Sequence, residues 1–155
     1  CFIFSTLLID EKDNHEYFCH KYKVSNKLKN ELSLLASHYV EFKENKNFLK
    51  KDLKKNIYKI GKNEIKNLVF FIYLAEKNFT KNLLDKTIEQ IEKITPPKFP
   101  YKGQYLIDQG ITDGKKIGYA LKELEREWIE KDFELNNKEA RLIVEKVKKL
   151  DVLYI

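Results

Sequence analysis

The chain has 155 residues, of which 43% are hydrophobic and 35% charged, and its formal net charge is +6. That length fits one domain or two small ones sharing a core, and the hydrophobic share excludes a largely disordered chain. Two cysteines are too few for a disulfide framework, which favours a reducing, cytoplasmic location. The first residue is Cys1 and methionine is absent, so we expect a fragment or a processed product.

The predicted elements are all helices. Residues 2–9 are expected to form a buried apolar helix, too short to cross a membrane. His15 and Cys19 share one face of the next helix, but only His38 could add a ligand of this kind, so packing is favoured over a zinc site. A third helix is expected to begin at an N-cap, Ser25, and to bury apolar positions at helical spacing, which are Leu28, Leu32, Leu35, Ala36 and Tyr39.

Residues 42–66 combine an uneven charge with a helical apolar stripe. Nine lysines (Lys43, Lys46, Lys50, Lys51, Lys54, Lys55, Lys59, Lys62 and Lys66) stand against Glu44, Asp52 and Glu64. The stripe predicts a helix with a packed inner face, made by Phe48, Leu49, Leu53, Ile57 and Ile60. The outer lysines, with Lys50, Lys51, Lys54 and Lys55 as the main candidates, would either bind an RNA backbone or simply be solvated. The pattern favours neither.

Two more helices are predicted before the prolines. Gly61 is expected to separate the lysine-rich helix from a strongly apolar one over residues 64–77, with Asn63 as its N-cap. This apolar helix is the expected centre of the N-terminal bundle. Thr80 is the expected N-cap of a helix over residues 81–93.

The stretch 96–133 holds all three prolines and four of the five glycines. Pro96 and Pro97 end the preceding helix, because proline lacks an amide hydrogen and its ring clashes with the previous turn. About two helical turns fit over residues 103–109. Gly110 is placed to cap them, because glycine accepts the left-handed backbone conformation.

A second helix of this stretch is predicted over residues 115–131, with Thr112 or Asp113 available as its cap. One face should be buried, since its apolar side chains recur at helical spacing, namely Ile117, Leu121, Leu124 and Trp128. Gly118 lies near the start of that face, and we expect it to let another backbone come close. After a turn at residues 136–137, a last helix is expected over residues 138–150; the partner of residues 152–155 is left open.

A helix–turn–helix corner of this kind points backbone amides outward at the start of its second helix, where the helix dipole also attracts anions. Gly110, Thr112 and Gly114 shape the turn, and Lys115 and Lys116 lie at the helix start. Lys102 comes just before the first helix. We predict a site for nucleic-acid phosphate here; the alternative is an ordinary helical corner with solvated lysines.

The same residues resemble the C-terminal signature of bacterial CCA-adding enzymes, which belong with bacterial poly(A) polymerases to one class of nucleotidyltransferase. The resemblance covers more than thirty positions and is carried by the pattern Pro97-x-Phe99-Pro100-x-x-Gly103-x-x-Leu106-x-x-x-Gly110-Ile111-x-x-Gly114-x-x-Ile117-Gly118-x-x-Leu121, followed by Glu125, Trp128 and Phe133. Three positions depart from it, which are Tyr105, Asp113 and Lys115. A shorter stretch around Ser25-Asn26 resembles the start of a helix in the body region of the same family.

The resemblance implies an all-α helical bundle with a C-terminal helix–hairpin–helix-like tail: a body region over residues 1–95 and a tail over residues 96–155. It implies a cytoplasmic transferase for tRNA processing that adds CMP and AMP to tRNA 3′ ends. The tail would bind tRNA, and magnesium, CTP and ATP would act in a catalytic head outside this fragment. Poly(A) polymerase is the close alternative, and an all-helical protein-interaction module without RNA binding is the distant one.

Catalytic motifs are missing from this sequence. Nucleotidyl transfer needs carboxylates that hold two metal ions, usually an Asp-x-Asp pair on a strand, and no such pair, strand or phosphate-binding loop is found. Asp10 and Asp13 stand in an apparent loop. We therefore expect no catalytic residue, metal or cofactor in this fragment, which alone should be inactive. The oligomeric state is left open.

Overall fold

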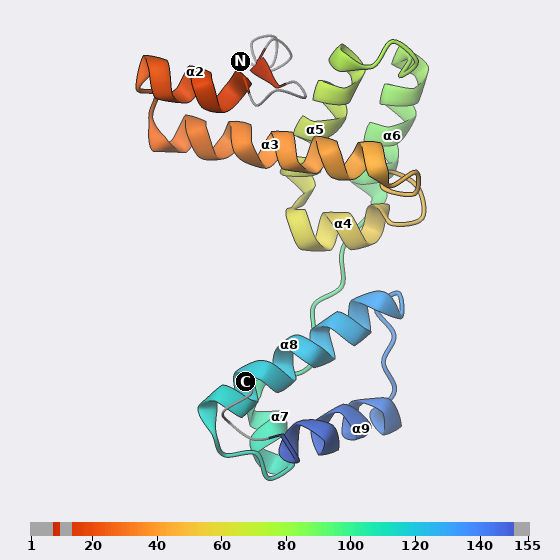
Figure 1. Ribbon diagram of the computed structural model, residues 1–155. Coiled ribbons are helices and arrows are strands. Elements are labelled where there is room, and N and C mark those ends of the chain that lie inside the picture. Colours follow the sequence, from red (N-terminus) through yellow and green to blue (C-terminus); the bar gives the residue numbers. More distant parts are fainter. Residues whose placement is uncertain (1–7, 10–13, 151–155) are drawn as a thin grey trace. The chain divides into compact units, whose positions relative to one another are not determined.

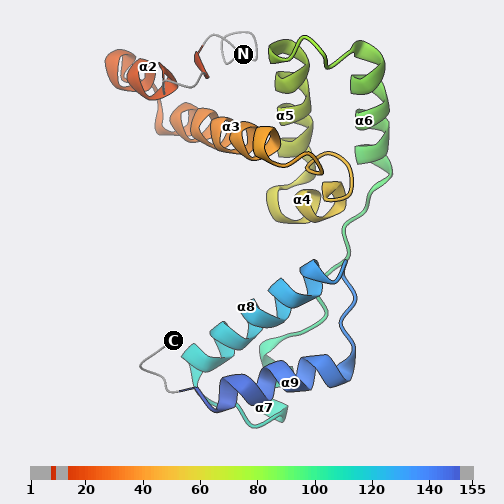
Figure 2. The same cartoon turned by 45° about the vertical axis from the view of Figure 1, so that its right-hand side comes forward.

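The fold is all-α, as predicted. The computed structural model describes residues 8–9 and 14–150, and within these residues it contains the helices α2 to α9 and no strand (Figures 1 and 2). The chain divides into two compact units, Cys1–Pro96 and Pro97–Ile155. The predictions for residues 2–7 and 152–155 lie outside the described residues.

The helices have clear limits in both units. The first unit contains α2 (Asn14–Tyr22), α3 (Asn26–Glu44), α4 (Leu53–Ile60), α5 (Lys62–Ala75) and α6 (Lys81–Lys93). The second unit contains α7 (Gly103–Asp108), α8 (Gly114–Glu130) and α9 (Asn137–Lys148).

Two predicted caps begin their helices. The amide of Leu28 donates to Ser25 Oγ at 3.3 Å, and the amide of Leu83 donates to Thr80 Oγ1 at 3.3 Å. Each cap satisfies a backbone donor that has no partner inside the helix, and such a cap contributes about 1 kcal/mol. Both predictions are confirmed.

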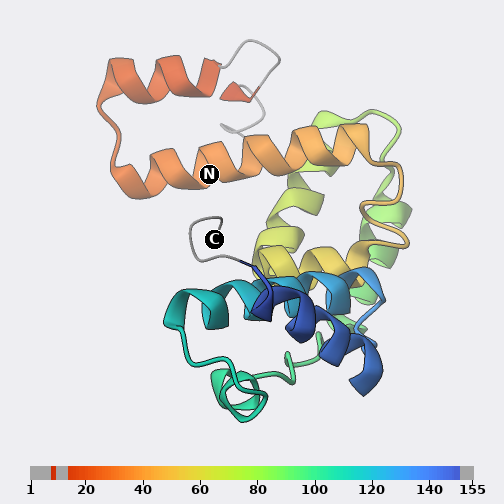
Figure 3. The ribbon, with the colours of Figure 1, turned by 60° about the horizontal axis from the view of Figure 1, so that its bottom comes forward.

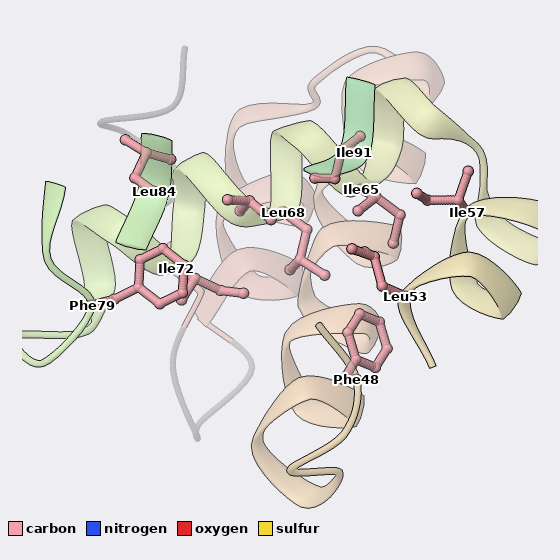
Figure 4. Close-up of a cluster of buried hydrophobic side chains, with 10 residues drawn as sticks. Phe48, Leu53, Ile57, Ile65, Leu68, Ile72, Phe79, Leu84 and Ile91 are labelled. Atoms are coloured by element: carbon pink, nitrogen blue, oxygen red, sulfur yellow. The ribbon is translucent and has the colours of Figure 1, made fainter. Parts of the chain in front are cut away.

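The core of the first unit forms around α5, the helix predicted to be its centre. Ile65, Val69 and Ile72 are fully buried, and they contact side chains from the neighbouring helices. Figure 4 shows this cluster, to which α4 contributes Leu53 and Ile57 and α6 contributes Leu84 and Ile91. Helices α5 and α6 lie side by side (Figure 2).

The apolar stripe over residues 48–60 does not lie on one helix as predicted, although Gly61 does separate α4 from α5. Helix α3 continues to Glu44, and a loop over residues 45–52 precedes α4. Phe48 is buried from this loop, with 2% of its surface exposed. The prediction fails because a buried loop side chain and a helical one leave the same apolar pattern in the sequence.

Two details at helix starts also differ from the prediction. Helix α5 has Gly61 as its N-cap, with φ at 110°, and no side-chain cap; Asn63 lies inside the helix. Gly118 is exposed, and a Cβ added there would meet nothing within 4 Å, so no backbone approaches it. Both predictions are wrong, because Gly61 and not Asn63 occupies the N-cap position of α5 and because Gly118 faces solvent.

Helix α7 ends at Asp108 with Gln109 as its C-cap, and Gly110 follows in the left-handed conformation, as predicted. The amide of Gly110 donates to the carbonyl of Ile107 at 2.8 Å, and the amide of Ile111 donates to that of Leu106 at 2.9 Å. With φ of Gly110 at 90°, this is a Schellman motif, and its usual apolar contact is present between Leu106 and Ile111, both buried. The motif turns the chain directly into α8.

Helix α8 supplies the main buried face of the second unit. Ala120 and Leu124 are fully buried against Ala140 and Val144 of α9. Of the four positions predicted to be buried, Leu124 and Trp128 are, whereas Ile117 and Leu121 are half-buried at its edge. Helices α8 and α9 lie side by side (Figures 1 and 2).

Helix α8 ends in a second Schellman motif, this time without glycine. The amide of Asp132 donates to the carbonyl of Ile129 at 3.1 Å, and the amide of Phe133 donates to that of Trp128 at 2.7 Å. Asp132 and Phe133 have φ of 58° and 70°, in the left-handed region that costs a residue with a Cβ free energy. The Phe133 ring packs on Trp128, with centroids 4.9 Å apart.

We therefore expect Asp132→Gly to raise the free energy of unfolding of the second unit by about 0.5–1 kcal/mol, because glycine adopts this backbone conformation without the Cβ penalty. Trp128, the only tryptophan, reports on this unit in a urea titration followed by fluorescence. Asp132→Ala removes the same charge but keeps a Cβ and should show no such gain. Equal stability of the two variants would contradict the prediction.

A polar contact joins α3 to the end of α5. Tyr39 Oη donates to Glu76 Oε1 at 2.5 Å, and Lys43 Nζ donates to the same oxygen at 2.9 Å. The hydrogen bond from Lys43, followed by that from Tyr39, lowers the pKa of Glu76 below its ordinary value. The ionised carboxylate is therefore stabilised by folding.

This pKa direction predicts how Glu76→Gln acts. A folded pKa below the unfolded one gives stability that is present above the unfolded pKa and is lost as the pH falls through the folded pKa. The substitution should lower the free energy of unfolding by about 1 kcal/mol at pH 7, and wild type and variant should converge in acid. Urea unfolding of the first unit followed by circular dichroism checks this; a difference independent of pH would refute it.

Candidate nucleic-acid interface

The helix–turn–helix corner predicted at residues 102–116, called the hairpin below, lies at the surface of the second unit. Gly110, Thr112, Gly114 and Lys115 are exposed, and only Ile111 is buried between them. The buried Ile111 fixes the turn to the core while its neighbours face solvent. The hairpin is therefore accessible to a ligand.

The amides at the start of α8 are not bare, however. Asp113 is the N-cap, and its Oδ1 accepts from the amides of Lys115 at 2.9 Å and Lys116 at 3.0 Å. The expectation of outward-pointing free amides is corrected on this point. An aspartate is a preferred N-cap because its carboxylate satisfies these donors and complements the helix dipole. It also places a negative charge where a phosphate would have to sit.

The three hairpin lysines are not equivalent. Lys102 and Lys115 are exposed, whereas Lys116 is half-buried. Lys116 Nζ donates to the carbonyl of Lys148, the last residue of α9, at 3.2 Å. A cation at this end complements the dipole of α9 and satisfies one of its terminal carbonyls. Lys116 therefore joins α8 to α9, which leaves Lys102 and Lys115 as the accessible cations of the hairpin.

The other predicted lysines lie on the 45–52 loop and on α4 of the first unit. Lys50 and Lys51 are exposed on the loop, and Lys54 and Lys55 are half-buried on α4. Lys46, on the loop, and Lys59, on α4, are exposed too. Lys46 was not among the candidates chosen from the sequence, although it belongs to the same run of nine lysines.

Hydrogen bonds hold the 45–52 loop in one conformation. The amides of Lys50 and Asp52 both donate to the carbonyl of Asn47, at 2.9 and 3.0 Å. Asn45 Nδ2 donates to Asp52 Oδ2 at 3.0 Å, which closes the loop across its ends. Asn56 Nδ2 of α4 donates to the carbonyl of Phe48 at 2.8 Å, next to the buried ring. The backbone that carries the loop lysines is thereby fixed.

The charge of the whole chain is concentrated here. Residues 43–66, the lysine segment, carry nine lysines against three acids, a net charge of +6 that equals the net charge of the entire chain. Summed over the rest of the chain, basic and acidic residues balance. Within the segment, Lys43 pairs with Glu76, and Lys62 and Lys66 pair with Glu92, so these three serve contacts between helices. The hydrogen bond from Lys66 chiefly lowers the pKa of Glu92.

Metal and membrane sites are not found in the described part of the chain. No three His, Cys, Asp or Glu side chains gather there to hold a metal ion. His15 and Cys19 are both buried in the first unit, as expected for packing residues. No helix among residues 8–9 and 14–150 is long and apolar enough to cross a bilayer.

Comparison of the chain with protein-family models, with curated proteins and with solved structures finds no match in any of the three.

Proposed function

We propose that this chain is the RNA-binding body and tail of a CCA-adding tRNA nucleotidyltransferase and that it binds the tRNA backbone through the lysine segment. The observation that carries the proposal is the concentration of the entire net charge in residues 43–66, on a backbone held by its own hydrogen bonds. The signature resemblance in the second unit supports the family. Transfer of CMP and AMP, with magnesium, CTP and ATP, belongs in this proposal to a separate catalytic head.

Binding of this kind suits a protein that must accept every tRNA. Contacts between lysines and phosphates position a nucleic acid without reading its bases. Each phosphate that is neutralised releases a counterion, so affinity falls steeply with added salt. Lys46, Lys50, Lys51 and Lys59 are exposed and are the proposed principal contacts, whereas Lys43, also exposed, pairs with Glu76.

The hairpin is the secondary contact in this proposal. Asp113 already occupies two amides of α8, and Lys116 is engaged with α9. Lys102 and Lys115 remain exposed and can each bind one phosphate as a point charge. We therefore expect the hairpin to contribute less than the lysine segment.

Of two alternatives to this proposal, only one predicts a different result for RNA binding. Poly(A) polymerase would use the same backbone contacts, since the signature is shared by that class. A protein-interaction module is favoured by one observation, an apolar groove of about 480 Å³ between α3 and the α4–α5 corner, where the side chain of Leu34 is exposed. Such a module would show no salt-dependent binding to RNA.

Titration of tRNA with this protein over a series of salt concentrations tests the proposal. We expect Lys50→Glu combined with Lys51→Glu to weaken binding at every salt concentration. The slope of log affinity against log salt should fall by roughly two, since each lost phosphate contact lowers it by about one. Lys102→Glu combined with Lys115→Glu should weaken binding less.

The matched control is Lys81→Glu combined with Lys86→Glu, which makes the same charge change at exposed positions of α6. It should lose only the small affinity that follows from net charge. An equal loss in the control would mean that no local site exists. Binding of tRNA that does not respond to salt, or no binding at all, would reject the proposal.

A further inference from the structure

Two tyrosines on α2 are among the most exposed large side chains of the described chain. Tyr17 has 64% and Tyr22 has 61% of its surface exposed. Lys21 lies between them: its Nζ is 5.6 Å from the centroid of the Tyr17 ring and 5.5 Å from that of Tyr22. We call Tyr17, Lys21 and Tyr22 the tyrosine platform.

The platform stands on a packed helix. Figures 1 and 3 show α2 alongside α3, and α2 is packed through the buried His15 and Cys19. The Phe18 and Tyr22 rings lie next to each other, tilted by 43°, with centroids 4.9 Å apart. The two tyrosines are thus held at fixed backbone positions, although their rings contribute little to the core.

Lysines outnumber acids on α2 and at the start of α3. Over residues 14–31 there are four lysines, Lys21, Lys23, Lys27 and Lys29, against Glu16 and Glu31. Helix α2 contains no aliphatic residue. The centre of a protein–protein interface is usually apolar and poor in charge, so this composition does not favour one. Aromatic rings interleaved with lysines are the composition that binds single-stranded nucleic acid, where bases stack on rings and cations contact phosphates.

We propose that the tyrosine platform binds unpaired nucleotides of single-stranded nucleic acid. A base stacks on the open face of Tyr17 or Tyr22, and Lys21, placed between the rings, contacts the phosphate that joins two such nucleotides. This goes beyond the proposed function, which needs only backbone contacts at the lysine segment. The platform requires bases that are free of a duplex, because a paired base offers no ring face to a side chain.

The test measures fluorescence anisotropy of a labelled single strand of about eight nucleotides, within the usual site sizes, at about 50 mM salt. The strand is tested both as RNA and as DNA, to determine which of the two nucleic acids the platform binds. A matched abasic strand keeps the phosphates and removes the bases. The protein variants are Tyr17→Ala with Tyr22→Ala, and Tyr17→Phe with Tyr22→Phe, which keeps both rings.

The alanine pair should lose about tenfold or more in affinity for the base-containing strand, which is the usual effect of removing a stacked aromatic. The phenylalanine pair should bind as wild type. Wild type should bind the abasic strand more weakly, and the alanine pair should not weaken that binding further. Leu83→Ala, at another exposed apolar position, is the control and should change nothing.

The inference would be overturned if wild type and the alanine pair bound the base-containing strand equally. It would also be overturned if the alanine pair lost as much affinity for the abasic strand as for the base-containing one. Tyrosine-dependent binding to anionic phospholipid vesicles without any to the oligonucleotide would assign the platform to a membrane surface instead and also overturn it. Failure here is distinct from failure of the proposed function, because the lysine-segment variants are measured on folded tRNA and keep both tyrosines.

Discussion

Burial of α5 is the constraint on which the first unit depends. Its residues Ile65, Leu68 and Phe71 have 1% or less of their surface exposed, and burying each such side chain contributes roughly 1.5–3 kcal/mol. Helices α3, α4 and α6 must therefore contact it from different sides. The lysine segment supplies core residues at Phe48, Leu53 and Ile57, and its lysines occupy positions outside this core.

The two candidate contacts for RNA use different physics. At the hairpin, a helix start offers partial positive charge, but Asp113 already satisfies two of its amides. In the lysine segment, the charges are full and several of them lack an acidic partner among the described residues. Full charges act over about a Debye length, whereas a helix terminus acts only within its last turn. This difference is why the lysine segment outweighs the hairpin in the proposed function.

Local rules predicted the fold well where one residue sets the geometry. Ser25, Thr80 and Gly110 each act through their own backbone or a neighbouring amide, so their roles can be inferred from a few residues. Prediction failed where the conformation or contact of a residue depended on a partner distant in the sequence. Phe48 lies in a loop rather than a helix, and Lys116 turned out to contact the end of α9, a residue far along the chain.

The closed 45–52 loop has a consequence for how this surface can evolve. Because hydrogen bonds and the buried Phe48 ring hold its backbone, a lysine on it can be gained or lost without moving its neighbours. The positive charge of this surface can thus change by one lysine at a time, and each change is nearly independent of the others. A substitution of Phe48 would act differently, because it would move all the lysines of the loop together.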